Sequence, residues 1–225
     1  MVEALFPRFC LGCHREGTVW CETCSQTWWP LGTPSGCPFC NRSGTGTTCV
    51  DCRPSVFLDG LSVFASYGNP VVREAIGQWK YVGDSAVRPV IREWLLRAAP
   101  RMCPPRVSEA VCAPVPLHIS KRRARGFDQA GELTDWCAEI FSVPAYDLLV
   151  RRSSNVSQAH RTQGQRAVGE LDHLFKIRAA IDVLPQRVIL CDDVFTSGAT
   201  MDSAARCLKE AGVSEVWGFV LAKGG

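Results

Sequence analysis

No long apolar run and no strong charge of either sign is present in this sequence of 225 residues. Hydrophobic residues make up 46% of the chain and mean hydropathy is +0.01, but no apolar stretch approaches the roughly 20 residues that a membrane-spanning helix needs. The net charge of +3 is too small to indicate nucleic-acid binding by itself, although it leaves room for a local basic patch. No apolar signal core precedes Cys10, so we expect a soluble, cytoplasmic protein without a membrane span.

Histidine is also scarce, with four residues in the chain. No Ser-His-Asp or Cys-His arrangement is visible that would indicate a nucleophile activated by histidine. Low-complexity tracts are missing, and the one internal repeat is a cysteine pair that recurs near the start of the chain. The length suits one α/β domain with a small additional module.

Cysteine, by contrast, is abundant, with thirteen residues, and eight of these form four Cys-x-x-Cys pairs before Asp59. Each pair places two thiolates on one tight turn, and two pairs complete a tetrahedral zinc site. The simplest assignment joins neighbouring pairs into two closed, structural sites, one of Cys10, Cys13, Cys21 and Cys24 and one of Cys37, Cys40, Cys49 and Cys52. Spacing alone leaves an interleaved arrangement open, whereas a reducing cytosol disfavours a disulfide framework.

The region around these pairs, from Met1 to about Pro54, has little periodic apolar pattern. We therefore expect metal to replace a hydrophobic core there and the region to unfold without zinc. Its aromatic residues are expected to pack around the metal turns, with stacking on nucleic-acid bases as the alternative; they are Trp20, Trp28, Trp29 and Phe39. The five remaining cysteines lie in apolar settings and are expected to be buried as small hydrophobic residues; they are Cys103, Cys112, Cys137, Cys191 and Cys207.

The segment from Val188 to Thr200, VILCDDVFTSGAT, is the most informative part of the chain. Its apolar residues, Val188 to Cys191, predict a strand buried on both faces of a parallel sheet. The pattern from Thr200 to Ala211 predicts an amphipathic helix, which Gly212 ends in a left-handed conformation. Phe195 to Ala199 is therefore expected to be a strand-to-helix loop.

A loop in that position can bind a phosphate monoester, because free backbone N–H groups and the positive end of the helix dipole face it. Gly198 allows close backbone approach. Like charges repel, so Asp192 and Asp193 suit a hydroxylated or cationic group beside the phosphate, such as a ribose ring or a magnesium ion. The alternative is a turn whose side chains only cap the helix. Under the phosphate interpretation, hydroxyl donors come from Thr196, Ser197 and Thr200.

Further periodic segments complete an α/β pattern. They predict a mostly parallel sheet flanked by helices, with ligands beyond the carboxyl ends of the strands. The residues from Pro100 to Pro105 are expected to break helical structure. Strands are expected over Gly60 to Tyr67, Glu109 to Pro114, Pro144 to Val150 and Val216 to Ala222, and helices over Val72 to Tyr81, Val87 to Leu95 and Gln129 to Phe141.

The topology brings three segments around one cleft: Pro116 to His118, the loop after Val150 and the loop from Asp192 to Thr200. Four basic residues follow the first of these in KRRARGFDQA, which begins at Lys121. A solvated basic face is the ordinary interpretation of such a run. In this neighbourhood, the guanidinium groups could instead stabilise the negative charge of a departing pyrophosphate; the candidates are Arg123 and Arg125.

The phosphate loop resembles the 5-phosphoribosyl 1-pyrophosphate (PRPP) signature of type I phosphoribosyltransferases. The order of the motifs along nearly the whole chain resembles the ComF family of competence proteins, which join a cysteine-rich zinc module to a phosphoribosyltransferase-like domain. The matching segments are the four cysteine pairs, YGNPVVREAIGQWKYVGD from Tyr67, PVPL from Pro114, RARGFDQA from Arg123 and DDVFTSGAT from Asp192.

This resemblance implies roles for particular residues. Asp192 and Asp193 would hold the ribose hydroxyls of PRPP, which binds with magnesium. Thr196, Ser197, Gly198, Ala199 and Thr200 would wrap its 5-phosphate, and Pro116, Leu117 and His118 would form the pyrophosphate loop. The implied domain division is a double zinc module over 1–55 and a phosphoribosyltransferase-like domain over 56–225, with a hood over 56–109 and a core over 110–225.

Two classes of function follow from the resemblance. The first is an enzyme that transfers a phosphoribosyl group from PRPP to an unidentified acceptor, releases pyrophosphate and contributes to competence and DNA uptake. Such a transfer needs positioning and charge stabilisation, and no protein nucleophile. The second is a non-catalytic factor that senses PRPP and handles single-stranded DNA together with DNA-uptake proteins. No motif in the sequence identifies the acceptor or the oligomeric state.

Overall fold

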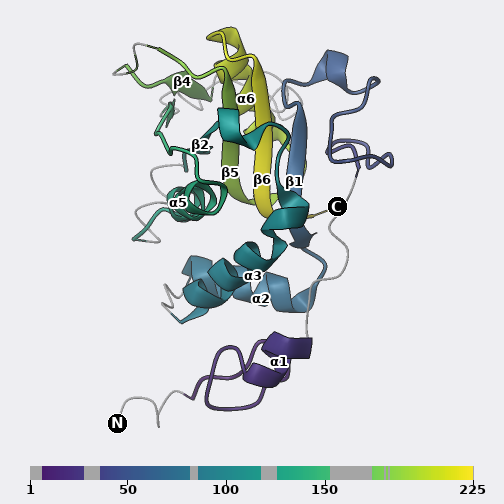
Figure 1. The fold of residues 1–225 in the computed structure, drawn as a ribbon, viewed down its shortest axis with the longest axis vertical. Coiled ribbons are helices and arrows are strands. Elements are labelled where there is room, and N and C mark those ends of the chain that lie inside the picture. The colour runs from purple at the N-terminus through teal and green to yellow at the C-terminus, as the bar shows by residue number, and fades with distance from the viewer. Residues whose placement is uncertain are drawn as a thin grey trace, which may run out of the picture.

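The computed structural model describes residues 7–27, 36–81, 86–117, 126–152, 174–179, 181 and 183–224. At its centre lies a parallel sheet of four strands in the order β1-β6-β5-β2 (Figure 1). The strands are nearly continuous apolar runs because both faces of the sheet are covered. Their bounds are β1 Gly60–Ser66, β6 Glu215–Lys223, β5 Arg187–Phe195 and β2 Val111–Pro114.

Helices cover the sheet on both faces, and the side chains of β5 alternate between the two. Ile189 and Cys191 belong to the core beneath α2, α3 and α5. Val188 and Leu190 belong to the core beneath α6. The main helices are α2 Pro70–Tyr81, α3 Val87–Met102, α5 Gln129–Phe141 and α6 Ala199–Glu210. The predicted fold class, a mostly parallel sheet flanked by helices, is confirmed.

The strand register brings the carboxyl ends of the strands to one edge of the sheet. Pro114 at the end of β2 pairs with Cys191, and Phe195 at the end of β5 pairs with Lys223. Beyond the end of β2, the N–H of Val115 donates to the carbonyl of Cys191 at 3.0 Å. The turn after β2 therefore starts beside the two carboxylates of β5.

Several predicted element boundaries are wrong. Helix α3 continues past Pro100 to Met102, because the proline falls in the last turn and the buried side chains of Ala98 and Met102 still anchor that turn in the core. The strand expected from Glu109 starts at Val111, since the short 3-10 helix η2 Val107–Glu109 precedes it. Strand β5 extends beyond its apolar run and includes Phe195, which was expected in the loop.

The strand expected from Pro144 to Val150 is mostly absent. Ala145 makes a single parallel bridge to Cys112, and the chain then turns away from the sheet. Strand β3, Leu149–Arg151, pairs instead in an antiparallel arrangement with β4, Phe175–Ile177. The fifth strand of the expected sheet is therefore reduced to one bridge.

The two cysteine-rich segments are anchored at different places on the fold (Figure 1). The first, residues 7–27 with α1 Glu22–Thr27, packs on α3, where the Trp20 ring meets the Trp94 ring edge-on with centroids 5.2 Å apart. The second, residues 36–55 with the short helix η1 Arg53–Ser55, runs along the edge strand β1. There, the N–H of Leu61 donates to the carbonyl of Gly46 at 2.8 Å. Trp28 and Trp29 lie outside the described residues.

Within the described part of the chain, no helix combines the length and the apolar character needed to cross a membrane.

Candidate functional site

The connection from β5 to α6 forms a small cavity at the carboxyl edge of the sheet. Gly198 precedes the first residue of α6 with a left-handed φ of 79° and has no side chain to cap the helix, while Oγ of Ser197 accepts from the N–H of Ala199 at 3.4 Å. The cavity has a volume of about 60 Å³ and is lined by Asp192 and by every residue from Val194 to Met201. Backbone N–H groups at the positive end of a helix favour an anion there. The Ser197 hydroxyl is the loop side chain that accepts from the first turn of α6, as the capping interpretation expects of such a turn.

Glycine is required at position 198 for two physical reasons. Its left-handed φ is one that residues with a side chain rarely adopt. In addition, a Cβ atom there would lie 2.4 Å from the Phe195 ring and 3.0 Å from the Phe39 ring. The loop thus rests directly on two aromatic rings, one from β5 and one from the second cysteine-rich segment.

Asp193 is buried and forms an ion pair that joins two parts of the fold. Its Oδ2 atom lies 2.9 Å from Nζ of Lys80, at the end of α2, and the two side chains are 11% and 14% exposed. Gln129, at the start of α5, donates from Nε2 to the carbonyl of Lys80 at 3.4 Å. The ammonium group is therefore held over the carboxyl edge of the sheet by elements far apart in the sequence.

Asp192 also has a cation in its neighbourhood. Burial lowers the pKa of Arg151, at the end of β3, while the negative charge of Asp192 opposes this shift. The Arg151 guanidinium lies over the Phe175 ring, 5.5 Å from its centroid. The Asp192 carboxylate accepts from the N–H of Asp193 at 2.8 Å. Each carboxylate of the pair thus has a basic residue near it.

Sequence patterns predicted the two carboxylates but neither cation as part of the site. Lys80 lies within the segment from Tyr67 that resembles the ComF family, and Arg151 follows Val150, after which a loop was expected, without a role assigned to either. No local motif marks either residue, because each reaches the carboxylates through tertiary packing. An ammonium and a guanidinium beside two carboxylates suit a ligand that carries both hydroxyl and phosphate groups.

The predicted pyrophosphate loop is described only in part. Pro116 and Leu117 follow β2 and are partly exposed, next to the buried Val115. His118, Arg123 and Arg125 lie outside the described residues. Their assignment to the site stays a prediction.

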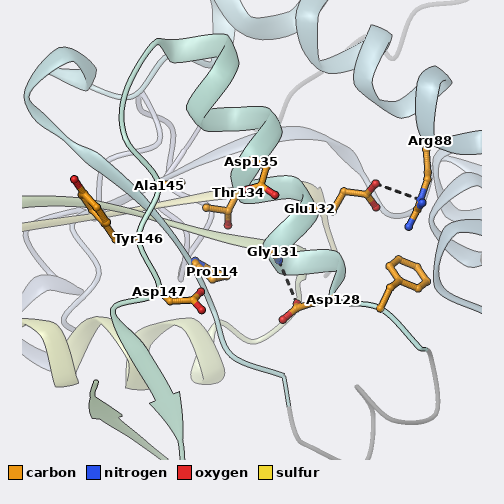
Figure 2. Close-up of a pocket in the computed structure, with 11 residues that line it drawn as sticks. Arg88, Pro114, Asp128, Gly131, Glu132, Thr134, Asp135, Ala145, Tyr146 and Asp147 are labelled. Carbon is orange, nitrogen blue, oxygen red and sulfur yellow. Dashed lines mark hydrogen bonds and ion pairs between the residues drawn. The ribbon is translucent and has the colours of Figure 1, made fainter. Parts of the chain in front are cut away.

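A larger cavity of about 590 Å³ opens beside the end of β2 (Figure 2). Its positive group, Arg88, lies 3.2 Å from a carboxylate oxygen of Glu132 and sits over the Phe127 ring. The other charged groups of the lining are carboxylates, which disfavour a phosphate group in this cavity. Its carboxylates come from α5, from the residue before α5 and from the loop before β3; they are Asp128, Glu132, Asp135 and Asp147.

Three buried thiols lie beneath the candidate site, from β2, α5 and β5. Burial raises the pKa of both Cys137 and Cys191. The pKa of Cys112 is also raised, chiefly by its hydrogen bond with Cys191 and then by burial. These cysteines are buried small residues, as predicted. The prediction is wrong for Cys103, which is exposed because the chain leaves the core at the end of α3, and Cys207 is only partly buried.

The eight paired cysteines form two separate groups of four. Within each group, all Sγ atoms lie within 4.8 Å of one another, and the distances include 3.7 Å for Cys13 to Cys21 and 3.6 Å for Cys40 to Cys49. A tetrahedral ion with Zn–S bonds of about 2.3 Å needs sulfur atoms about 3.8 Å apart, so the spacing fits zinc. All thirteen cysteines are free thiols. In the structure, each group therefore joins two neighbouring pairs. This excludes the interleaved arrangement and the disulfide framework.

The charges within each group explain why a cation belongs there. Burial tends to raise the pKa of Cys10 and Cys37, but backbone N–H groups outweigh it and lower the pKa to about 6 in both. The largest of these contributions come from the neighbouring pairs, from Cys21 and Cys49, and the others from the cysteines' own turns. The pKa of Cys24 is raised to about 12, chiefly by burial and then by the neighbouring thiols. The pKa of Cys52 is also raised to about 12, chiefly by hydrogen bonding to Cys49 and then by burial. Four adjacent thiolates repel one another, so a bound cation is needed to keep all of them ionised.

Comparison with known proteins identifies relatives along most of the chain. A family model described as phosphoribosyl transferase domain matches residues 135–225, which include the β5–α6 loop. Competence protein ComFC of Streptococcus pneumoniae is 26% identical over 214 residues, covering 93% of this chain and 90% of the relative. Competence protein ComFC of Bacillus subtilis is 29% identical over 184 residues, covering 78% and 72%.

Competence protein F of Haemophilus influenzae is 25% identical over 212 residues, covering 85% of this chain and 91% of the relative. Among solved structures, adenine phosphoribosyltransferase from Leishmania tarentolae is 16% identical with a TM-score of 0.37, covering 65% of this chain and 74% of that one.

Proposed function

This chain belongs to the ComF family, and from that premise we propose that it binds PRPP at the β5–α6 loop and transfers the phosphoribosyl group with release of pyrophosphate. One observation carries the proposal: the N-terminus of α6 at Gly198 and the Asp192 carboxylate line one small cavity, with Asp193 beside it in β5. An anion site and a hydroxyl-binding site side by side match a phosphorylated sugar.

In this proposal, the loop from Thr196 to Thr200 holds the 5-phosphate through backbone N–H groups and hydroxyl groups. Asp192 and Asp193 accept hydrogen bonds from the ribose hydroxyls. Magnesium would bind together with PRPP, at its pyrophosphate group, because carboxylate, hydroxyl and phosphate oxygens are the donors that it prefers. The bond from the anomeric carbon to pyrophosphate breaks, and a lone pair of the acceptor forms the new bond. Arg123 and Arg125 are assigned to the charge that develops on the leaving group.

The two cysteine groups are proposed to hold one structural zinc ion each, within a module that spans 1–55, while the phosphoribosyltransferase-like domain spans 56–225. The names of the relatives support a role in competence. We propose a cytoplasmic protein that contributes to DNA uptake. The basic run from Lys121 to Arg125 supports the alternative, in which PRPP is a signal and single-stranded DNA is the partner.

A double variant, Arg123→Ala with Arg125→Ala, distinguishes the two functions. If these residues stabilise the leaving group, the variant should release pyrophosphate more slowly and bind PRPP about tenfold or more weakly, with little change for ribose 5-phosphate, which lacks pyrophosphate. If they contact DNA, single-stranded DNA should bind more weakly and with a flatter salt dependence, while PRPP is unaffected. Titration calorimetry with PRPP and magnesium, ribose 5-phosphate and a single-stranded oligonucleotide measures all three. Unchanged binding of every ligand would show that the run is a solvated basic face.

Replacement of Lys80 by methionine tests the role of the hood in ligand binding. When ribose hydroxyls occupy Asp193, the Lys80 ammonium is released from its ion pair and can reach a phosphate group of the ligand. We therefore expect Lys80→Met to weaken PRPP binding about tenfold, and more than ribose 5-phosphate binding. Lys176→Met, which removes an exposed ammonium from β4, is the control for the loss of charge alone. If the affinities for PRPP and ribose 5-phosphate fall by the same factor, the role of Lys80 is only to neutralise the charge of Asp193.

A further inference from the structure

The turn that carries the ligands Cys37 and Cys40 also contacts the candidate phosphate loop. Phe39 lies between these two cysteines in the chain, and its ring meets the Phe195 ring edge-on, with centroids 6.0 Å apart and an interplanar angle of 68°. The same ring covers Gly198, where a Cβ atom would lie 3.0 Å from Cε1 of Phe39. Phe39 was expected to pack around its metal turn, but it packs on the loop between β5 and α6.

A second contact from the same turn reinforces the first. Asn41 accepts a hydrogen bond at its Oδ1 atom from Nζ of Lys223, at the end of β6. The Lys223 ammonium lies 6.0 Å from the centroid of the Phe195 ring. The backbone of Phe195 also accepts from the N–H of Gly224 at 2.8 Å. Phe195, which supports Gly198, is therefore enclosed by the cysteine turn and by the end of β6.

The direction of the Phe39 ring depends on the conformation of its turn. The N–H of Asn41 donates to the carbonyl of Cys37 at 3.0 Å, and the N–H of Cys37 donates to the carbonyl of Arg42 at 2.8 Å. The backbone N–H of Phe39 is among the groups that favour the Cys37 thiolate. Because both flanking thiols belong to the second group of four, an ion bound there would fix the turn and with it the ring.

We infer that the second cysteine group is a positioning element of the phosphate site, and that Phe39 is the residue through which it acts. The identity of the ligand in this inference rests on the proposed function, whereas the contact of Phe39 with Phe195 and Gly198 does not. By holding Phe39 against Phe195 and Gly198, the turn keeps the loop in the conformation that forms the small cavity at the N-terminus of α6. The first cysteine group packs on α3 through Trp20 and provides an internal control.

Phe39→Ala is the decisive variant. We expect it to weaken PRPP and ribose 5-phosphate about tenfold and by the same factor, because both ligands share the 5-phosphate. Metal content should stay at the wild-type value, and Phe39→Tyr, which keeps the ring, should restore binding. Trp20→Ala, the matched change in the first segment, should leave both affinities within twofold of wild type. Phe39 is only partly buried, so folding can be checked by thermal unfolding without an expected large loss.

A second readout needs no ligand. In Phe39→Ala, the backbone amide signals from Ser197 to Thr200 should shift and broaden relative to wild type, because the loop loses its fixed conformation, whereas Trp20→Ala should leave them unchanged. If wild type binds neither PRPP nor ribose 5-phosphate while these amides respond, the proposed function fails and the positioning role stands. If Phe39→Ala leaves the amides and the affinities unchanged, or if only its metal content falls, the inference is overturned.

Discussion

Asp193→Asn is expected to weaken PRPP binding about 10- to 100-fold. The proposed role of this carboxylate is to accept from the ribose hydroxyls, and a hydrogen bond to a charged group contributes about 1.5–3 kcal/mol. The substitution keeps the shape of the side chain but removes its charge. It also leaves the Lys80 ammonium, which lies 2.9 Å from Asp193 and is 14% exposed, without its partner. Titration calorimetry with PRPP and magnesium measures the effect.

Loss of affinity must be separated from loss of stability, because breaking a mostly buried ion pair can cost about 3 kcal/mol. The double variant Asp193→Asn with Lys80→Met removes both charges, so its free energy of unfolding should return toward the wild-type value. Its affinity for PRPP should not recover. Asp135→Asn, an exposed carboxylate on α5, is the control for the net change in charge. Wild-type affinity in Asp193→Asn would remove this carboxylate from the proposed site.

The parts of the fold that the sequence predicted are those with strong local patterns. Helix α5 has the predicted bounds, since its apolar period and the N-cap Asp128 are both local features. The carboxylate pair and Gly198 were found for the same reason, because the strand, the turn and the helix are consecutive. Even the grouping of the eight cysteines follows from the neighbouring pairs, although spacing alone did not exclude the interleaved alternative.

The parts that were not predicted depend on contacts between distant segments. Lys80 reaches Asp193 only because α2 folds over the carboxyl edge of the sheet. Phe39 reaches Gly198 only because the second cysteine-rich segment runs along β1. The strand expected at Pro144 is reduced to one bridge, because the following residues pair with β4 instead. No pattern within a short window records such partners, and this limits what a single sequence can say about a site.

Two zinc ions per chain are expected in the purified protein, and their removal should unfold both cysteine-rich segments. Zinc contributes about 10–16 kcal/mol to the folding of zinc-finger peptides, which is comparable to the whole stability of an ordinary domain. Acid should release the ions, because protons compete for the thiolates; in the absence of metal, even the most acidic thiols, Cys10 and Cys37, have a pKa of about 6. Metal analysis and the release of reactive thiols on chelation measure these effects.

Single substitutions assign each ion to its group. Cys10→Ala and Cys37→Ala should each lower the content to about one ion per chain, whereas Cys103→Ala, an exposed cysteine outside both groups, should retain two. Because the second group contacts the phosphate loop through Phe39, whereas the first packs on α3 through Trp20, Cys37→Ala should also weaken ribose 5-phosphate binding more than Cys10→Ala does. A wild-type content of one ion would mean that a cysteine group is idle. A content of zero, with the cysteines oxidised to disulfides, would refute the metal sites altogether.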